Sequence, residues 1–195
     1  IASEWGDEEF DRRLAEFSPD VVMLETKTPV VTRHWAYVRE LKRRLPEARV
    51  VLVGDHVTAL PEESFAQCPV DFILTGGDYD FLLINLLDVL AAGTFDAARL
   101  EPGVWWREGG GVRNSGPFRL DHDLRSMPRI DRELTQWRLY AEKNGNYRRT
   151  PGTYIMSGRD CWHGKCTFCS WTTIYPSFRA RDPKEVVGEI GELIE

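Results

Sequence analysis

The chain has 195 residues, of which 42% are hydrophobic and 29% charged, and its formal net charge is −6. These values are typical of a folded globular protein and exclude wholesale disorder. The longest apolar run, around residues 81–92, is interrupted by Asn85 and Asp88, and no secretory signal opens the chain. We therefore predict no membrane segment and a cytoplasmic location. Because the first residue is Ile1 and not Met, we expect the natural amino terminus, including one N-terminal strand, to be missing.

The first hundred residues alternate between strand-like and helix-like patterns. Short apolar runs predict buried strands at residues 20–24, 48–53 and 71–74. Helical patterns follow them at residues 32–45, from Pro61 onward, and at residues 79–92. This order predicts an α/β domain over residues 1–98, with a doubly wound parallel sheet of the Rossmann-like type.

Loops rich in small and polar residues follow the three predicted strands, at residues 26–29, 54–60 and 75–78. In open parallel sheets, ligands bind beyond the carboxyl ends of the strands. These loops are therefore a candidate ligand site. Ordinary strand-to-helix turns are the alternative interpretation of the same residues.

Residues 99–150 have a different pattern and are predicted to form a linker between two domains. Two short apolar segments joined by glycines predict a β-hairpin over residues 103–113. Pro117, Pro128 and the lack of long apolar runs indicate a connector after the hairpin. Trp105 and Trp106 are interpreted as hairpin core residues in preference to a substrate platform.

The last segment, residues 151–195, again has a regular pattern. Residues 153–157 predict a strand, a loop containing three cysteines follows, and Asp182-Pro183 is a typical start for a helix over residues 184–194. A strand, a ligand loop and a helix form the opening unit of a βα barrel. We expect the rest of such a barrel to lie outside this sequence.

The cysteine loop contains Cys161, Cys166 and Cys169, in a C-x4-C-x2-C spacing. Clustered cysteines in a sequence of cytosolic type indicate metal binding more than disulfides. Three thiolates can each hold one iron of a cuboidal cluster and leave a fourth iron open to another ligand. Structural zinc, with His163 as a fourth ligand, and simply buried thiols are the alternatives. Cys68 stands alone and is expected to pack as a small apolar residue.

Charge differs between the halves of the chain. Residues 1–100 carry 10 basic and 18 acidic side chains, whereas residues 101–195 carry 15 and 13. Arginines near aromatic residues in the second half would suit a nucleic acid. The excess is small, so a solvated helix and linker surface is the preferred interpretation, and nucleic acid is not expected as a partner.

The cysteine loop and the strand predicted before it resemble the radical S-adenosylmethionine (radical SAM) enzymes. Residues 157–161 are similar to the family's strand-to-cluster junction, and Cys166-Thr-Phe-Cys169 matches its C-x-aromatic-C ending. Residues 54–63 and 71–77 resemble the cobalamin-binding domain of the B12-dependent subgroup, and residues 179–187 resemble the entry to the first barrel helix. The resemblance extends over nearly the whole chain.

Two features depart from the family pattern. The usual spacing is C-x3-C-x2-C, so this loop has one extra residue, which we interpret as a bulge at residues 162–164 made possible by Gly164. The D-x-H-x-x-G motif, which supplies an axial histidine to some cobalamin domains, is absent because Asp55 and His56 are adjacent. The resemblance thus implies that His56 does not replace the corrin base in the manner of that motif.

The resemblance implies three cofactors: a [4Fe-4S] cluster, S-adenosylmethionine and cobalamin. Cys161, Cys166 and Cys169 would hold the cluster, and Phe168 would lie near the adenine of S-adenosylmethionine. No catalytic side chain is assigned. The residues assigned to cobalamin share a place in the loops after the strands: Thr26, Gly54, His56, Thr58, Gly76 and Gly77.

The implied function is radical chemistry, in which S-adenosylmethionine is cleaved to a 5′-deoxyadenosyl radical and a methyl group is transferred to an unactivated carbon. The partners implied are a small-molecule or peptide substrate and an electron donor such as flavodoxin or ferredoxin. Alternatives are a non-methylating radical enzyme with an empty cobalamin-like domain, and a zinc- or cluster-stabilised nucleic-acid binding module. The 195-residue chain alone is expected to lack turnover, because barrel enzymes take substrate contacts from many strand ends.

Overall fold

The computed structural model describes residues 5–143 and 148–194. These divide into two compact units, which are considered separately. The sheet unit comprises Ser18–His122 and Asp160–Phe178, and the second unit comprises the remaining described residues. In the part of the chain described, no helix is both long and apolar enough to cross a membrane.

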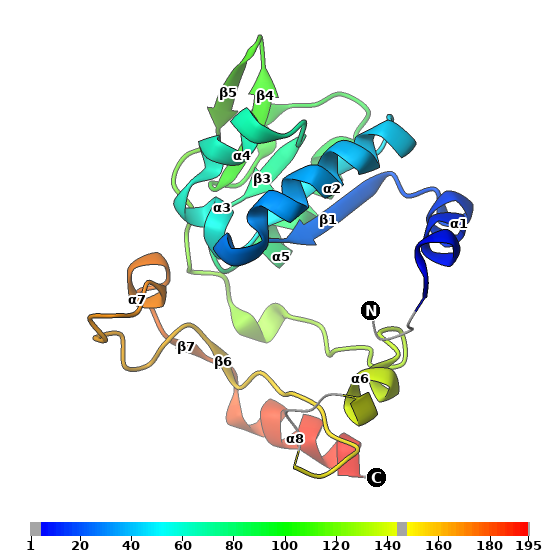
Figure 1. Ribbon diagram of the computed structural model, residues 1–195. Coiled ribbons are helices and arrows are strands. Elements are labelled where there is room, and N and C mark those ends of the chain that lie inside the picture. The colour runs from blue at the N-terminus through cyan, green and yellow to red at the C-terminus, as the bar shows by residue number, and fades with distance from the viewer. Residues whose placement is uncertain (1–4, 144–147, 195) are drawn as a thin grey trace. The chain divides into compact units, whose positions relative to one another are not determined.

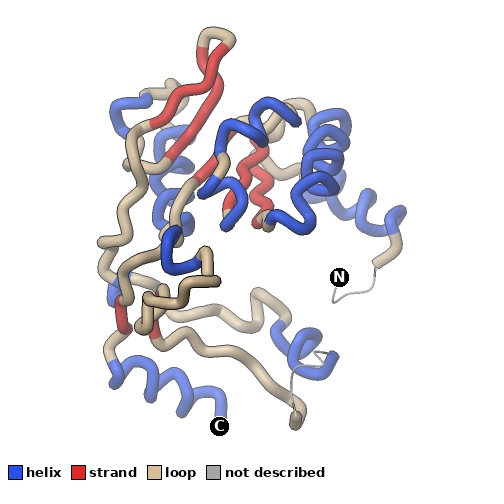
Figure 2. The backbone as a smooth tube through the Cα atoms, turned by 60° about the vertical axis from the view of Figure 1, so that its left-hand side comes forward, coloured by secondary structure: helices blue, strands red, loops and turns tan. Residues whose placement is uncertain are grey.

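The sheet unit is built on a five-stranded sheet with the order β1-β2-β3-β4-β5 (Figures 1 and 2). The strands are β1 (Val21–Glu25), β2 (Arg49–Val53), β3 (Phe72–Leu74), β4 (Val104–Glu108) and β5 (Gly111–Asn114). The helices are η1 (Thr28–Val30), α2 (Val31–Arg44), α3 (Asp55–Ala59), α4 (Pro61–Gln67), α5 (Tyr79–Ala91), η2 (Ala97–Arg99) and α7 (Trp171–Ile174). The predicted α/β class is confirmed.

The sheet is mixed, which corrects the prediction of a wholly parallel sheet. Strands β1, β2 and β3 are parallel, as their alternation with helices predicts. The hairpin β4–β5 forms where the sequence predicts it, but β4 pairs antiparallel with β3 through Phe72–Trp106 and Leu74–Val104. Residues assigned to a linker therefore complete the edge of the sheet.

Helices cover both faces of this sheet, with α2, α3 and α4 in front of it in Figure 1 and α5 behind. Helix α5 buries Leu82, Leu86 and Val89, at intervals of four and three residues, against the face that carries Val51, Val53 and Leu74. Alternate residues of the strands point to the opposite face. There α2 packs with β2, and its Trp35 indole donates a 2.9 Å hydrogen bond to Ser64.

The hydrophobic core explains why this part of the sequence was predictable. Val50, Val51, Leu52 and Val53 are all 0% exposed, as expected for a strand covered on both faces. Cys68 is also buried, as predicted, and its thiol lies 3.2 Å from the Ser64 carbonyl oxygen. Burial raises the pKa of this thiol, which is consistent with a packing role.

The second unit contains mostly short elements. They are α1 (Asp7–Phe17), η3 (Leu124–Ser126), α6 (Trp137–Lys143), β6 (Gly158–Arg159), β7 (Arg179–Ala180) and α8 (Pro183–Ile194). The predicted helix start is confirmed, because Asp182 accepts a 2.8 Å hydrogen bond from the Lys184 backbone N–H. The predicted strand at residues 153–157 is wrong: the strand that forms, β6, has two residues and pairs with β7.

A buried ion triad holds the second unit together. Glu189 is 1% exposed and accepts hydrogen bonds from Arg132 at 2.6 Å and from Arg181 at 2.8 Å. Burial alone would raise the pKa of Glu189, but the two arginines hold it below the ordinary value. Such a triad needs all its members, because removing one partner leaves an uncompensated buried charge.

Candidate functional site

The candidate site lies at the carboxyl edge of the three parallel strands. Strands β1, β2 and β3 end at Glu25, Val53 and Leu74, and all six residues predicted to contact cobalamin lie in the segments that follow. The loops after β1 and β2 are connected where they begin, because the Thr26 N–H donates a 2.7 Å hydrogen bond to the Val53 carbonyl. The structure therefore brings these residues to one edge of the sheet.

Gly54 permits a close approach between the first two loops. Its φ is +107°, and a Cβ at this position would lie 2.5 Å from the Thr26 carbonyl oxygen. Only glycine satisfies both constraints without a shift of the backbone. The glycine at the end of β2 thus has a local structural reason.

Thr58 joins the second loop to the third. Its hydroxyl donates a 2.8 Å hydrogen bond to the Gly54 carbonyl and accepts one of 3.0 Å from the Gly76 N–H. Thr58 lies on α3, a five-residue helix where the sequence predicted only a turn. The segments after β2 and β3 are consequently fixed to each other by one side chain.

His56 is enclosed by protein in this structure. The side chain is 4% exposed, its Nδ1 lies 3.2 Å from Thr28 Oγ1, and its ring meets Trp35 edge-on at 5.9 Å. Its Nε2 lies 3.2 Å from a Glu63 carboxylate oxygen, but the pair is not aligned as a hydrogen bond. The ring is therefore a packing residue at this edge, with one nitrogen directed to an acidic side chain.

Thr26, Gly76 and Gly77 show how closely atoms pack at this edge. Within the described residues, the buried hydroxyl of Thr26 has no hydrogen-bond partner, which is an uncommon situation for a buried polar atom. At Gly76, with a φ of +90°, a Cβ would lie 2.6 Å from the Phe118 ring. At Gly77 a Cβ would meet Tyr175 at 3.3 Å. The edge thus combines an unsatisfied hydroxyl with backbone that only small residues allow.

A pocket of about 600 Å³ opens beside Thr58. Its lining includes Trp105 of β4, Phe118 and residues 58–63. Trp105 therefore lines a pocket and differs from its neighbour Trp106, which is 7% exposed and belongs to the core. Mostly apolar walls with a few polar groups are typical of small-molecule sites.

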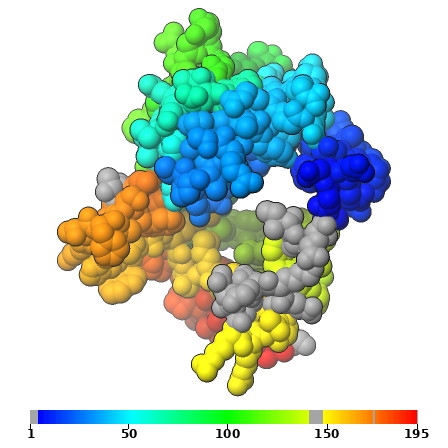
Figure 3. Space-filling model, viewed as in Figure 1, coloured from blue at the N-terminus to red at the C-terminus, as the bar shows by residue number. Residues whose placement is uncertain are grey.

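The cysteine loop lies at the surface of the sheet unit (orange in Figure 3). Cys161, Cys166 and Cys169 are half-buried free thiols, and the Cys169 N–H donates a 3.2 Å hydrogen bond to the Cys166 carbonyl. Gly164 has a φ of +59°, as the predicted bulge requires. Phe168 is 90% exposed, so its side chain is accessible to a ligand.

The donor chemistry of this loop fits an iron–sulfur cluster. Thiolates are the ligands that iron–sulfur clusters take, and the loop offers three of them within nine residues. In the described residues, no three Cys, His, Asp or Glu side chains converge as a preformed metal site. The assignments of the three cysteines and of Phe168 therefore stay predictions.

The segment after the cysteines packs on the carboxyl edge of the sheet. Helix α7 is followed by Tyr175, which is 3% exposed and donates a 3.0 Å hydrogen bond to Asp55 at the start of α3. Burial, and then the carboxylate of Asp55, raise the pKa of this phenol. Sequence reasoning did not single out this pair, because the residues are 120 positions apart and belong to no motif.

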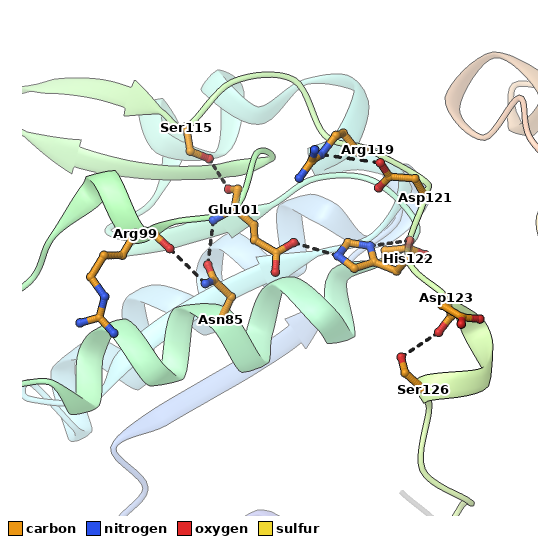
Figure 4. A network of polar contacts seen from close by, with 10 residues as sticks. Asn85, Arg99, Glu101, Ser115, Arg119, Asp121, His122, Asp123 and Ser126 are labelled. Carbon is orange, nitrogen blue, oxygen red and sulfur yellow. Dashed lines mark hydrogen bonds and ion pairs between the residues drawn. The ribbon is translucent and has the colours of Figure 1, made fainter.

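A second polar cluster lies near the hairpin of the sheet unit (Figure 4). His122 lies 2.8 Å from Asp78 through Nδ1 and 2.8 Å from Glu101 through Nε2, and its ring stacks on Phe81 at 4.4 Å. Burial alone would lower the pKa of His122, but the hydrogen bonds to Glu101 and Asp78 raise it. Because both ring nitrogens are engaged by carboxylates, this cluster is a structural tie and not an open ligand site.

No protein-family model matches the chain, but curated relatives do. The chain is 26% identical over 189 residues to an anaerobic magnesium-protoporphyrin IX monomethyl ester cyclase of Cereibacter sphaeroides, covering 96% of this chain and 30% of that protein. It is 25% identical over 181 residues to an uncharacterized methyltransferase of Pyrococcus horikoshii, covering 92% and 38%. A cyclase of the same name from Rubrivivax gelatinosus is 23% identical over 198 residues, covering 100% and 35%. The chain thus spans about a third of the length of these relatives, all of which are named as enzymes.

Proposed function

We propose that the chain contributes two cofactor-binding elements to a radical SAM enzyme: the loop that holds a [4Fe-4S] cluster and an α/β domain that binds cobalamin. The observation that carries the proposal is their proximity. The cysteine loop and the carboxyl edge of the sheet belong to one compact unit and are linked by Tyr175 and Asp55. The similarity of this chain to part of a cyclase and part of a methyltransferase supports an enzyme of this kind.

The chain's own residues have distinct parts in this proposal. Cys161, Cys166 and Cys169, as thiolates, would hold three irons, and the exposed Phe168 would lie against the adenine of S-adenosylmethionine. The chemistry supplied by such a cluster is reductive cleavage of S-adenosylmethionine to methionine and a 5′-deoxyadenosyl radical, with the methyl group coming from cobalamin.

The carboxyl edge suits a large, flat ligand with many carbonyl and amide groups. Gly54 and Gly76 let the loops pack closely beneath the edge, and the backbone at Gly77 is partly exposed there. Amide side groups of a corrin would bond to the backbone groups that are exposed at this edge. His56 and Thr58, already engaged by protein, would hold the loops in place beneath the ligand.

A second reaction class has a specific observation in its favour. Two of the relatives are named cyclases, so the same radical chemistry could close a ring without methyl transfer. In either case the substrate, an electron donor such as flavodoxin or ferredoxin, and a reducing cytoplasm are part of the proposal.

The test is cofactor loading of the anaerobically purified 195-residue chain. Iron, sulfide and zinc would be measured after reconstitution, and hydroxocobalamin would be titrated by absorption spectroscopy. The matched control replaces all three loop cysteines by Ala. We expect four irons per chain and saturable corrin binding in the wild type, with only the iron lost in the control.

Two other results would favour different interpretations of the chain. Iron without corrin binding would favour the non-methylating reaction. One zinc per chain and no cluster would contradict the proposal and favour the binding-module interpretation, which a nucleic-acid shift assay would then examine.

A further inference from the structure

Tyr175 is a buried polar residue that the proposed cofactor contacts do not use. It lies six residues after Cys169 and directly after α7, its phenol is 3.0 Å from Asp55 Oδ1, and the residue is 3% exposed. A buried hydroxyl that donates to a carboxylate makes one of the stronger neutral-to-charged hydrogen bonds. Because burial raises the pKa of the phenol, its proton stays available for this bond over the physiological pH range.

Two other contacts fix the tyrosine ring. Trp171, one turn earlier, meets it in an edge-to-face arrangement at 4.6 Å with an interplanar angle of 63°. Gly77 also lies against the ring: a Cβ there would lie 3.3 Å from it, so the absence of a side chain lets Tyr175 approach the loop after β3. The tyrosine therefore contacts both the second and the third loop of the carboxyl edge.

Asp55, which accepts this hydrogen bond, lies next to residues that connect two loops of the edge. It follows Gly54, whose carbonyl is bound by Thr58, and Thr58 in turn binds the Gly76 N–H. A shift of Asp55 would therefore be transmitted through Gly54 and Thr58 to the loops after β2 and β3. Figure 1 shows α7 near the end of α3 in the sheet unit, where this connection is made.

We propose that Tyr175 and Asp55 form a clasp, a pair of positioning residues that holds the cysteine loop at a fixed place against the carboxyl edge of the sheet. Its role in catalysis rests on the proposed function, in which the clasp would set the separation between the iron–sulfur cluster and the corrin. The clasp itself concerns only residues of this chain and is testable without either cofactor.

The first test uses the cofactor-free chain and the variants Tyr175→Phe and Asp55→Asn, which preserve shape. The matched control is Tyr140→Phe, which changes an exposed tyrosine of α6. Amide hydrogen exchange would be measured in residues 160–178 and in β2 and β3, together with the rate at which iodoacetamide alkylates the three loop cysteines. We expect exchange and alkylation in the loop to accelerate on the order of tenfold in Tyr175→Phe and by less in Asp55→Asn, whose amide oxygen still accepts a weaker hydrogen bond, with β2 and β3 unchanged.

The combination of the two substitutions adds a sharper criterion. If the hydrogen bond is what holds the loop, the double variant should exchange no faster than the more affected single variant. Loop exchange equal to wild type in both single variants would overturn the proposal. Equal acceleration in β2, β3 and the loop would also overturn it, because that result indicates a general loss of stability and not a local clasp.

The second test uses the chain loaded with cluster and cob(II)alamin, and measures the magnetic interaction between them by pulsed electron paramagnetic resonance. We expect a narrow distance distribution in wild type and Tyr140→Phe and a broad one in Tyr175→Phe. If neither cofactor binds, the proposed function fails while the exchange experiment still decides the clasp. If both bind and the distributions are identical, the clasp does not set their separation.

Discussion

The sheet and the cysteine loop belong to one unit but are held by different kinds of interaction. The strands are held by continuous apolar burial: Val50 to Val53 are inaccessible, and α5 covers one face with Leu82, Leu86 and Val89. The loop exposes Trp162 and Phe168 by 79% and 90%, and its end is tied at Tyr175 by a hydrogen bond to Asp55. Burial therefore gives the unit its stability, whereas a few directional contacts give the loop its place.

The largest effect on stability is expected from a substitution that leaves a cavity between α5 and the sheet. Leu86 is 0% exposed in the cluster between α5 and the strands, so Leu86→Ala should lower the free energy of unfolding by about 2–5 kcal/mol. The control is Ile84→Ala on the same helix, a residue that is 59% exposed; its effect should stay within about 0.5 kcal/mol. Urea denaturation followed by circular dichroism measures both. Similar losses in the two variants would show that α5 does not pack as described.

A smaller effect is expected at the carboxyl edge. At Gly54 a Cβ would collide with the Thr26 carbonyl, and its φ is +107°, so Gly54→Ala should cost about 1–3 kcal/mol of backbone strain. The same denaturation experiment applies. Gly191→Ala is the control, because its Cβ would meet open space within α8 and alanine favours a helix interior. An unchanged midpoint in Gly54→Ala would contradict the close approach of the two loops.

The smallest effect is a dependence of the unfolding free energy on pH, caused by the protonation of His122. The fold raises the pKa of this residue through Glu101 and Asp78 against the opposing effect of burial, so the protonated ring is favoured in the folded state. Its contribution to stability should be fully present below the unfolded value of about 6.5 and should be lost as pH rises through the folded value. The difference in unfolding free energy between wild type and His122→Gln should thus be larger at pH 5.5 than at pH 8.5. Equal differences at the two pH values would argue against a charged His122.

The comparison also explains what the sequence could predict. A strand covered on both faces leaves a continuous apolar run such as residues 48–53, and an amphipathic helix leaves a period such as that of α2. These local patterns located β1, β2, β3, α2, α5 and α8 within a few residues. The glycines at 54, 76 and 77 and the threonines at 26 and 58 lie in the segments after the strands, and their contact with a ligand stays a prediction.

A local sequence pattern does not indicate which distant segments pair with each other. The hairpin was predicted, but nothing in residues 103–114 indicates that β4 pairs antiparallel with β3. The run at 153–157 has strand-like residues, yet a strand needs a partner, and pairing in this region is limited to Gly158–Arg159 with Arg179–Ala180. The contact between Tyr175 and Asp55 was missed for the same reason. A buried tyrosine shortly after a ligand loop is the signal that could have suggested it.

The central claim, that Cys161, Cys166 and Cys169 hold a [4Fe-4S] cluster with one open iron, is tested most directly by electron paramagnetic resonance. The reconstituted, dithionite-reduced chain would be measured with and without S-adenosylmethionine, beside the variant in which the three cysteines are replaced by Ala. The account predicts a four-iron signal whose g values change when S-adenosylmethionine is added and which is absent from the variant. A signal of the same intensity in the variant, or a cluster signal that S-adenosylmethionine leaves unchanged, would contradict it.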